Sequence, residues 1–307
     1  MASTAPPFGR PGPRAGAAGQ GGTAGTAGST GAARDVGWAE RLPAPAKLAL
    51  RRYPGKLPAY RLALAARRAP QAVALGWVER REAQRALCWW GRRPAASVVT
   101  VVSTYRRPAR VQRAVASALA QSWRDHVVLV IDDGAGLPPL PADPRLFTYS
   151  LSQRSASPGL VRNVGIRASA SRWLAFLDDD NEWRPDHLSC ALQAHDQGAE
   201  LTYAALERVD EAGTVLDVLS VPFERRRLRE RAFVDTSSIV VARRSSVRFA
   251  RAPHRRGEFP LEDWALAYRL SRTLCTVHIP VPTVRYLVHE GSRFTDWGQV
   301  GLLGGGP

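Results

Sequence analysis

Residues 173–185 read W-L-A-F-L-D-D-D-N-E-W-R-P, and this stretch decides the fold. Its first five residues are mostly apolar and long enough to form a strand that is buried on both faces. The pattern breaks at Asn181 and Pro185, after three consecutive carboxylates. The stretch therefore predicts an acidic cluster at the end of a buried strand, made of Asp178, Asp179 and Asp180.

Three adjacent carboxylates repel one another, so such a cluster is tolerated mainly where a cation or hydrogen-bond donors compensate its charge. Oxygen ligands of this kind suit Mg²⁺ or Mn²⁺, which keep coordination positions open for substrate phosphates. A solvated acidic turn, or a helix N-cap before the following P-D-H-L, explains the same spacing equally well. The rest of the chain has to decide between these interpretations.

Composition limits the class of protein. The chain has 307 residues, of which 45% are hydrophobic, enough for one large core or two modest ones. Its apolar runs fall well short of the roughly 20 residues that cross a bilayer. Cys88, Cys190 and Cys275 are far apart and odd in number, so we expect a reducing compartment, no disulfide framework and no thiolate metal site.

The net charge of +16 is unevenly distributed. Residues 1–95 contain 16 lysines and arginines against 4 acidic residues, whereas residues 96–307 contain 27 against 23. The basic character therefore belongs to the leader, which argues against a nucleic-acid groove in the main domain. It favours a leader that meets water, anionic lipid or an acidic partner.

The leader has two parts. Residues 1–36 are rich in Gly, Ala, Thr and Pro and are predicted to be disordered. Residues 37–95 form a basic extension, in which helical spacing broken at Pro54, Pro58 and Pro70 predicts two or three short helices. These helices could lie on a membrane surface, but we favour packing against the main domain with arginines facing solvent.

A βαβ unit follows the leader. Residues 97–103 and 126–131 read as buried strands, separated by a helix at 109–121, which requires a parallel sheet with a right-handed crossover. Ligands of such sheets bind beyond the carboxyl ends of the strands. A D-D-G turn that simply ends the second strand is the plain alternative. The polar residues at the two strand ends are Thr104, Tyr105, Arg106, Asp132 and Asp133.

Further strands and helices follow, in a less regular order in the second half of the chain. Arg162 and Asn163 lie near the start of a predicted helix, where backbone N–H groups and a guanidinium favour phosphate oxygens. Glu262 and Asp263 lie in the first turn of another, where the helix dipole alone also favours acids. The predicted strands are 146–151, 174–177, 201–205, 215–219, 235–241, 276–281 and 283–288, and the predicted helices are 159–170, 185–197, the arginine-rich 225–231 and 258–270.

Taken in order, these pieces resemble the inverting GT-A glycosyltransferases of family 2 over residues 96–297, with residues 298–307 as a flexible C-terminus. The resemblance rests on the order and spacing of several short stretches, each weak alone. It implies an α/β, Rossmann-like fold with a mainly parallel central sheet and flanking helices. The stretches are V-V-S-T-Y-R-R-P, A-S-A-L-A-Q-S, V-L-V-I-D-D-G, R-N-V-G, F-L-D-D-D-N-E-W-R-P, D-T-S-S-I-V-V, L-E-D-W-A-L-A-Y-R-L and Y-L-V-H-E-G-S.

The resemblance also implies roles for particular residues. Thr104, Tyr105 and Asp133 would contact the nucleoside, with Asp132 beside them. Arg162 and Asn163 would lie near the ribose and diphosphate. Asp178 and Asp180 would be the outer aspartates of the D-x-D motif, with Asp180 the stronger candidate for the metal. Asp263 would be the general base with Glu262 alongside it, and His289 would lie near the metal or diphosphate.

The implied reaction moves a sugar from a nucleoside diphosphate sugar to the hydroxyl of a carbohydrate, lipid-linked or small-molecule acceptor, with Mn²⁺ or Mg²⁺ as cofactor. The hydroxyl is a poor nucleophile, so a carboxylate must accept its proton as it attacks. We expect a cytoplasmic protein, with peripheral contact at the inner face of the membrane as an option. The alternatives are a metal-dependent nucleotidyltransferase, a membrane or nucleic-acid binding protein that uses the basic leader, and a glycosyltransferase relative that binds without turnover.

Overall fold

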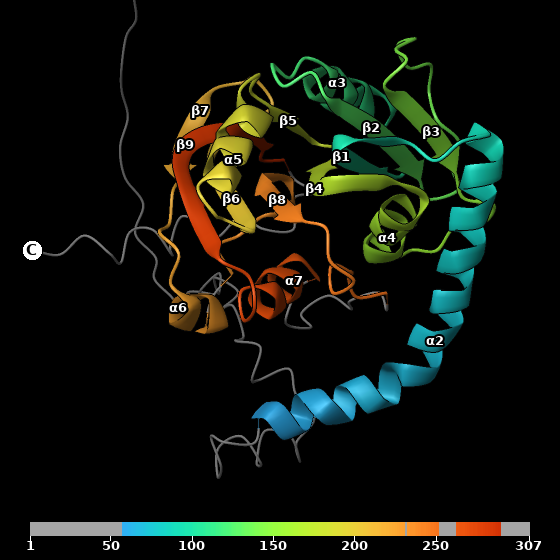
Figure 1. Cartoon of the computed structure of the whole chain (residues 1–307), viewed down its shortest axis with the longest axis horizontal. Coiled ribbons are helices and arrows are strands. Elements are labelled where there is room, and N and C mark those ends of the chain that lie inside the picture. The colour runs from blue at the N-terminus through green and yellow to red at the C-terminus, as the bar shows by residue number, and fades with distance from the viewer. Residues whose placement is uncertain (1–56, 231, 252–261, 290–307) are drawn as a thin grey trace, which may run out of the picture. The chain divides into compact units, whose positions relative to one another are not determined.

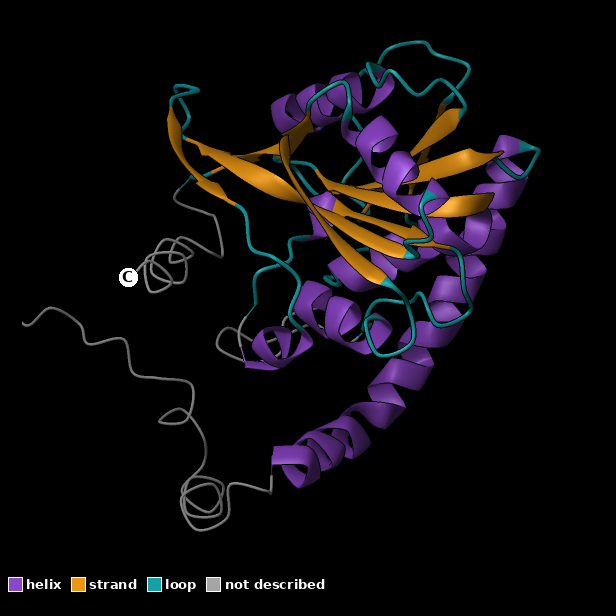
Figure 2. Ribbon diagram, turned by 60° about the vertical axis from the view of Figure 1, so that its left-hand side comes forward, coloured by secondary structure: helices purple, strands orange, loops and turns teal. Residues whose placement is uncertain are grey.

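The computed structural model describes residues 57–230, 232–251 and 262–289. Several predicted features lie outside these ranges: the low-complexity leader at 1–36, the first part of the basic extension, the start of the helix predicted from residue 258, and the C-terminus at 298–307. Within the described ranges, one nine-stranded sheet carries helices on both of its faces (Figures 1 and 2).

The first half of the sheet is parallel, as predicted, in the order β3-β2-β1-β4. Helices α3 and α4 form the crossovers and pack on β1 and β2. Both faces of these strands are covered, which explains their almost uninterrupted β-branched and apolar sequence. The elements are β1 (Ala95–Thr104), α3 (Pro108–Leu119), β2 (His126–Asp132), β3 (Leu146–Ser150), α4 (Pro158–Ala168) and β4 (Ala170–Asp178).

The second half of the sheet is mixed, in the order β4-β8-β6-β9-β5, with β7 paired to β6. β8 is antiparallel to β4 and to β6, whereas β9 runs parallel to β6. The elements are β5 (Asn181–Trp183), α5 (His187–Asp196), β6 (Leu201–Val209), β7 (Val215–Leu219), α6 (Arg225–Glu230), the 3₁₀ helix η3 (Thr236–Ser238), β8 (Ile239–Ala242), α7 (Glu262–Leu270) and β9 (Thr276–Leu287).

Three expectations for this half were wrong. The strand predicted at 235–241 is shorter, because residues 236–238 form the 3₁₀ helix η3 and only Ile239–Ala242 form β8. Residues 276–281 and 283–288 form one long strand, because the register with β6 shifts around Ala204 and Ala205 and absorbs the prolines. The sequence pattern also missed β5, since Asn181 was taken as a break. β5 exists because it pairs with β9, which is distant in sequence.

The basic extension was predicted as two or three short helices, and this was also wrong. The described part is a single 34-residue helix, α2 (Leu57–Trp90). Pro58 falls in its first turn, where no N–H is needed. Pro70 lies inside the helix and removes one backbone hydrogen bond, and Figure 1 shows the helix bending along its length. The favoured alternative of packing on the main domain is confirmed, because α2 contacts α4 and β3.

The carboxyl ends of β1, β2 and β4 lie at one edge of the sheet, and α4 packs closely against these strands. A methyl group on Gly165 of α4 would lie 2.7 Å from Val101 Cγ1, so only glycine allows this approach. In the register of the parallel strands, Thr104 is beside Asp132, and Ser103 is beside Asp178. The β1, β2 and β4 ends therefore form one continuous edge.

Two further expectations can be compared with the described residues. No helix in these ranges combines the length and the apolar character needed to span a bilayer. The three cysteines, Cys88, Cys190 and Cys275, are free thiols, as the sequence indicated.

Candidate active site

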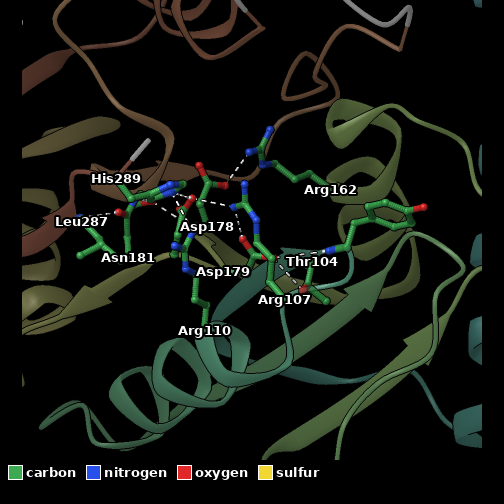
Figure 3. A network of polar contacts seen from close by, with 12 residues as sticks. Thr104, Arg107, Arg110, Arg162, Asp178, Asp179, Asn181, Leu287 and His289 are labelled. Carbon is green, nitrogen blue, oxygen red and sulfur yellow. Dashed lines mark hydrogen bonds and ion pairs between the residues drawn. The ribbon is translucent and has the colours of Figure 1, made fainter. Parts of the chain in front are cut away.

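The acidic cluster predicted from the sequence lies at the carboxyl edge of the sheet, where β4 ends. Asp178, Asp179 and Asp180 each contact a different set of partners, which lie at the end of β1, just before α3, on α4 and just after β9. Figure 3 labels Asp178 and Asp179 with several of these partners. The cluster is therefore held by specific donors and is not a solvated turn.

Asp179, the middle aspartate, faces into the protein. Its Oδ2 accepts a 2.7 Å hydrogen bond from Thr104 Oγ1, and its Oδ1 accepts one of 2.8 Å from Arg107. The backbone N–H of Tyr105 lies 3.4 Å from Oδ2. Burial raises the pKa of Asp179, and the Arg107 guanidinium and the Thr104 hydroxyl oppose this rise. Asp179 thus ties the end of β4 to the loop after β1.

Asp178 faces a different group of residues. Its Oδ1 accepts a 2.5 Å hydrogen bond from Arg162 Nη2, while Arg162 Nη1 donates to Glu262 Oε1 at 2.6 Å. Arg162 is 5% exposed, and its two carboxylate neighbours raise its pKa against the effect of burial. This guanidinium joins the end of β4 to the first turn of α7, which holds both predicted catalytic acids.

Asp180 completes the trio on the side of β9. Its Oδ2 lies 2.6 Å from an Arg107 nitrogen and 3.3 Å from His289 Nε2. His289 Nε2 also lies 2.8 Å from Arg110 Nη1. The structure thus brings the predicted metal residues Asp180 and His289 together.

Asp263, the predicted general base, is largely withdrawn from water. Burial raises its pKa to about 7, and the neighbouring Glu262 and Asp178 carboxylates add to this rise. Its Oδ1 accepts a hydrogen bond of 2.6 Å from the backbone N–H of Trp264. A carboxylate in this condition exchanges protons near neutral pH, as a general base requires.

The donor set suits a divalent cation. Asp178 and Asp180 could supply carboxylate oxygens and His289 an imidazole nitrogen. Burial, and to a lesser extent Asp180, raises the pKa of Asp178, and a bound cation would oppose this rise. The described residues contain no ready-made group of three acidic, His or Cys side chains around one point. Arg107 and Arg162 instead neutralise these carboxylates in the structure.

The nucleoside residues predicted from the resemblance are arranged around the loops after β1 and β2. The Tyr105 ring lies 5.2 Å from the guanidinium carbon of Arg106 and 4.3 Å from that of Arg154. Arg106 has a positive φ of 55°, an uncommon conformation for a non-glycine residue. Its side chain is exposed, so the pair Tyr105 and Arg106 presents an aromatic ring and positive charge at the sheet edge.

Three other predicted site residues, Asp132, Asp133 and Asn163, form hydrogen bonds with other residues of the chain. Asp132 Oδ2 accepts backbone hydrogen bonds from residues 135 and 136, while its buried Oδ1 has no hydrogen-bond partner among the residues that the structure describes. Asp133 accepts hydrogen bonds from the backbone of residues 155 and 156. Asn163 is fully buried, and its amide contacts Glu79 and Phe249 and not the acidic cluster. These three side chains therefore hold the segments around the site in place.

Sequence reasoning assigned no role to several residues of this network. Arg107 and Arg110 stand in the T-Y-R-R-P-A-R run, and their position at the start of a helix beside the sheet edge could have indicated them. Asp235 is buried, and its pKa is raised well above the ordinary value by burial and by Asp178 and Asp263. Tyr286 was not predictable, because only the pairing of β9 with β5 brings it near these acids.

Comparison with known proteins now points to a family. Residues 99–248, which we call the family 2 domain, match the model of glycosyl transferase family 2. Over this region the chain is similar to family 2 glycosyltransferases. The family 2 domain includes the acidic cluster and the residues at the ends of β1 and β2. Glu262, Asp263, Tyr286 and His289 lie outside the matched residues.

Two curated relatives come from Rhizobium meliloti. The family 2 domain is similar to the succinoglycan biosynthesis protein ExoO, with 37% identity over 129 residues, which are 40% of this chain and 37% of ExoO. It is also similar to ExoW, with 36% identity over 108 residues, which are 32% of this chain and 34% of ExoW. The chain thus spans only about a third of the length of these relatives.

A solved structure supports the fold. Residues 1–349 of S. aureus TarS superpose with a TM-score of 0.50 at 14% identity, covering 62% of this chain and 60% of TarS 1–349. The same protein in complex with UDP-GlcNAc also gives a TM-score of 0.50, covering 65% and 61%. The expected GT-A-type α/β fold is thereby confirmed.

Proposed function

We propose that the chain is an inverting glycosyltransferase, which moves a sugar from a nucleoside diphosphate sugar to an acceptor hydroxyl. The observation that carries this proposal is the Arg162 bridge. It joins Asp178, at the donor edge of the family 2 domain, to Glu262, beside the partly buried Asp263. Donor-binding and proton-accepting groups in one site are what this reaction requires.

In this proposal, Asp178, Asp180 and His289 are the residues that would hold a divalent cation, Mn²⁺ or Mg²⁺. When bound, the cation supplies electrostatic stabilisation of the leaving group. Arg107 pairs with Asp179 and Asp180 in the structure, and it is well placed to exchange these carboxylates for phosphate oxygens. Arg162 pairs with both Asp178 and Glu262 in the structure.

Asp263 accepts the proton of the acceptor hydroxyl. As that oxygen attacks the anomeric carbon, its proton passes to an Asp263 oxygen, and the bond to the diphosphate breaks with its electron pair on the phosphate oxygen. A single in-line displacement inverts the anomeric centre and needs no carboxylate nucleophile. The raised pKa of Asp263 supports this role, because a stronger base removes the proton more readily.

Thr104, Tyr105, Asp132 and Asp133 remain the proposed nucleoside side of the site, with Arg106 beside them. The fold shared with TarS, solved with UDP-GlcNAc, makes a UDP-sugar the first donor to test. Similarity to two succinoglycan biosynthesis proteins favours a carbohydrate or lipid-linked acceptor. A cytoplasmic location with peripheral membrane contact fits such an acceptor, and we retain it as part of the proposal.

The test is a donor screen with the full chain. We expect one nucleoside diphosphate sugar to raise the melting temperature in the presence of Mn²⁺, and we expect chelation or Asp180→Ala to abolish this shift. Stabilisation that survives chelation unchanged would refute the metal role. Release of pyrophosphate from a nucleoside triphosphate would instead identify a nucleotidyltransferase.

Turnover requires a second measurement. Asp263→Asn should retain donor binding but lose nucleoside diphosphate release with acceptor, whereas the surface control Asp186→Asn should retain both. The anomeric configuration of the product, read by NMR, should be opposite to that of the donor. Retention of configuration would overturn the single displacement.

A further inference from the structure

Helix α2 separates its charges between two faces. Its two acidic residues, Glu79 and Glu82, are 0% and 1% exposed. Glu79 pairs with Arg167 and Arg251 and accepts a hydrogen bond from Asn163. Glu82 accepts hydrogen bonds from Ser152 and Tyr149. Both acidic side chains of the helix therefore contact the domain and attach the helix to it.

The opposite face of α2 carries apolar and positively charged side chains. We call it the outer face, and it consists of Val73, Trp77, Arg80, Arg81, Gln84 and Cys88, all exposed. Their spacing places them on one side of the helix over roughly 22 Å. Val73 and Trp77 are 62% and 67% exposed. Trp89, which follows Cys88 at the end of the helix, is 74% exposed. Large apolar side chains at this level of exposure indicate an interaction surface.

We propose that the outer face of α2 binds the surface of an anionic lipid bilayer. Trp77 has the amphipathic ring that settles at the level of lipid headgroups. The guanidinium carbon of Arg80 lies 5.4 Å from the centre of that ring, so one contact delivers an aromatic group and a positive charge to the same depth. Arg80 and Arg81 then pair with lipid phosphates.

Charge favours this partner over a second copy of the chain. A second copy would bring the same +16 to the contact, and the outer face contains no acidic residue to receive it. An anionic bilayer attracts both the outer face and the rest of the basic leader, which holds 16 lysines and arginines in residues 1–95. This inference rests on the outer face of α2 and on the charge of the leader. It deepens the membrane contact included in the proposed function, but it does not depend on the proposed reaction.

The test is co-sedimentation of the full chain with vesicles of phosphatidylcholine that contain phosphatidylglycerol. Arg80→Gln with Arg81→Gln should weaken partitioning roughly 30-fold, or about 1 kcal/mol for each arginine. The matched control removes two exposed arginines of α6, by Arg225→Gln with Arg229→Gln, and should bind like the wild type. Equal binding by both double variants, or equal binding to pure phosphatidylcholine, would overturn the proposal.

Cys88 allows a direct readout of the contact. An environment-sensitive fluorophore on Cys88, in a Cys190→Ser and Cys275→Ser background, should shift to the blue when anionic vesicles are added. The same label on the exposed Cys275, with the other two cysteines replaced, should not shift. A shift at Cys275 alone would place the bilayer elsewhere. Loss of a dimer on Trp77→Ser, without loss of vesicle binding, would assign the face to self-association.

Discussion

At the scale of single residues, Arg162 connects the two acidic motifs of the chain. Its guanidinium is almost fully buried between Asp178 and Glu262, 16 and 100 residues away in sequence. A buried cation with two carboxylate partners is costly to remove, because both acids are then left without compensation. Arg162 therefore determines the stability of the site as well as its geometry.

Replacing Arg162 tests this dependence. Arg162→Leu should lower the free energy of unfolding by about 3 kcal/mol, measured by urea denaturation. Arg113 serves as the control, since it is more than half exposed and lies 3.6 Å from Glu182. Arg113→Leu should cost less than about 1 kcal/mol. Equal losses for the two variants would mean that the bridge adds nothing to stability.

Asp263 makes transfer dependent on pH. Its pKa of about 7 leaves it protonated, and unable to accept a proton, below neutrality. We expect kcat/KM to rise tenfold for each pH unit below about 7 and to level off above it. The variant Asp263→Asn should lose its transfer activity, and with it this pH dependence. A profile that is flat from about pH 5.5 to 8 would contradict the assignment of Asp263 as the base.

At the scale of elements, α2 is attached to the domain through a buried acid. Glu79 contacts α4 through Arg167 and the segment after β8 through Arg251. Burial raises the pKa of Glu79, but its hydrogen bonds and ion pairs with these two arginines outweigh burial and leave the pKa lowered. The long helix is therefore held by a few polar contacts as well as by apolar packing.

Removing the charge of Glu79 should loosen this helix. Glu79→Gln should cost roughly 2 to 4 kcal/mol, because two arginines lose their partner. Amide hydrogen exchange of residues 70–90 should become faster, while the exchange of β1 and β2 remains slow. The exposed pair of Glu200 with Arg244 provides the control, and Glu200→Gln should leave exchange in α2 unchanged. Unchanged exchange in Glu79→Gln would show that apolar packing alone holds α2.

At the scale of the whole molecule, buried histidines should make the fold sensitive to acid. Burial lowers the pKa of His187 to about 3, and it also lowers that of His126 and His195. Below pH 6.5 these three histidines bind more protons in the unfolded chain than in the folded one, so their contribution to stability falls as the pH falls. Asp263 acts with the opposite sign, because its raised pKa disfavours the folded state as the pH rises from about 4 to 7.

The variant His187→Gln should reduce this acid sensitivity. The free energy of unfolding should decrease less steeply between about pH 6.5 and 4 than in the wild type, because one buried group that must stay neutral has been removed. The packing cost of the substitution is measured separately at pH 7.5, where His187 is neutral in both states. Parallel stability profiles for the two proteins would exclude His187 as a source of acid sensitivity.

The sequence alone determined most of the first half of the fold. The strands at 97–103 and 126–131, the intervening helix and the acidic strand end were all readable, because period and turn residues are local properties of the chain. The same local signals placed Thr104, Asp132 and Asp178 at one edge, since parallel strands share their carboxyl ends.

Only the tertiary structure decided which distant groups meet. It paired Arg162 with Glu262, brought Asp235 and Tyr286 near the acids, created β5 through β9, and joined the helices of the extension into α2. The packing of α2 on the domain also buries Glu79 and leaves Trp77 exposed to solvent. The physical reason is that these contacts join residues far apart in sequence, so their energies depend on packing that no local pattern encodes.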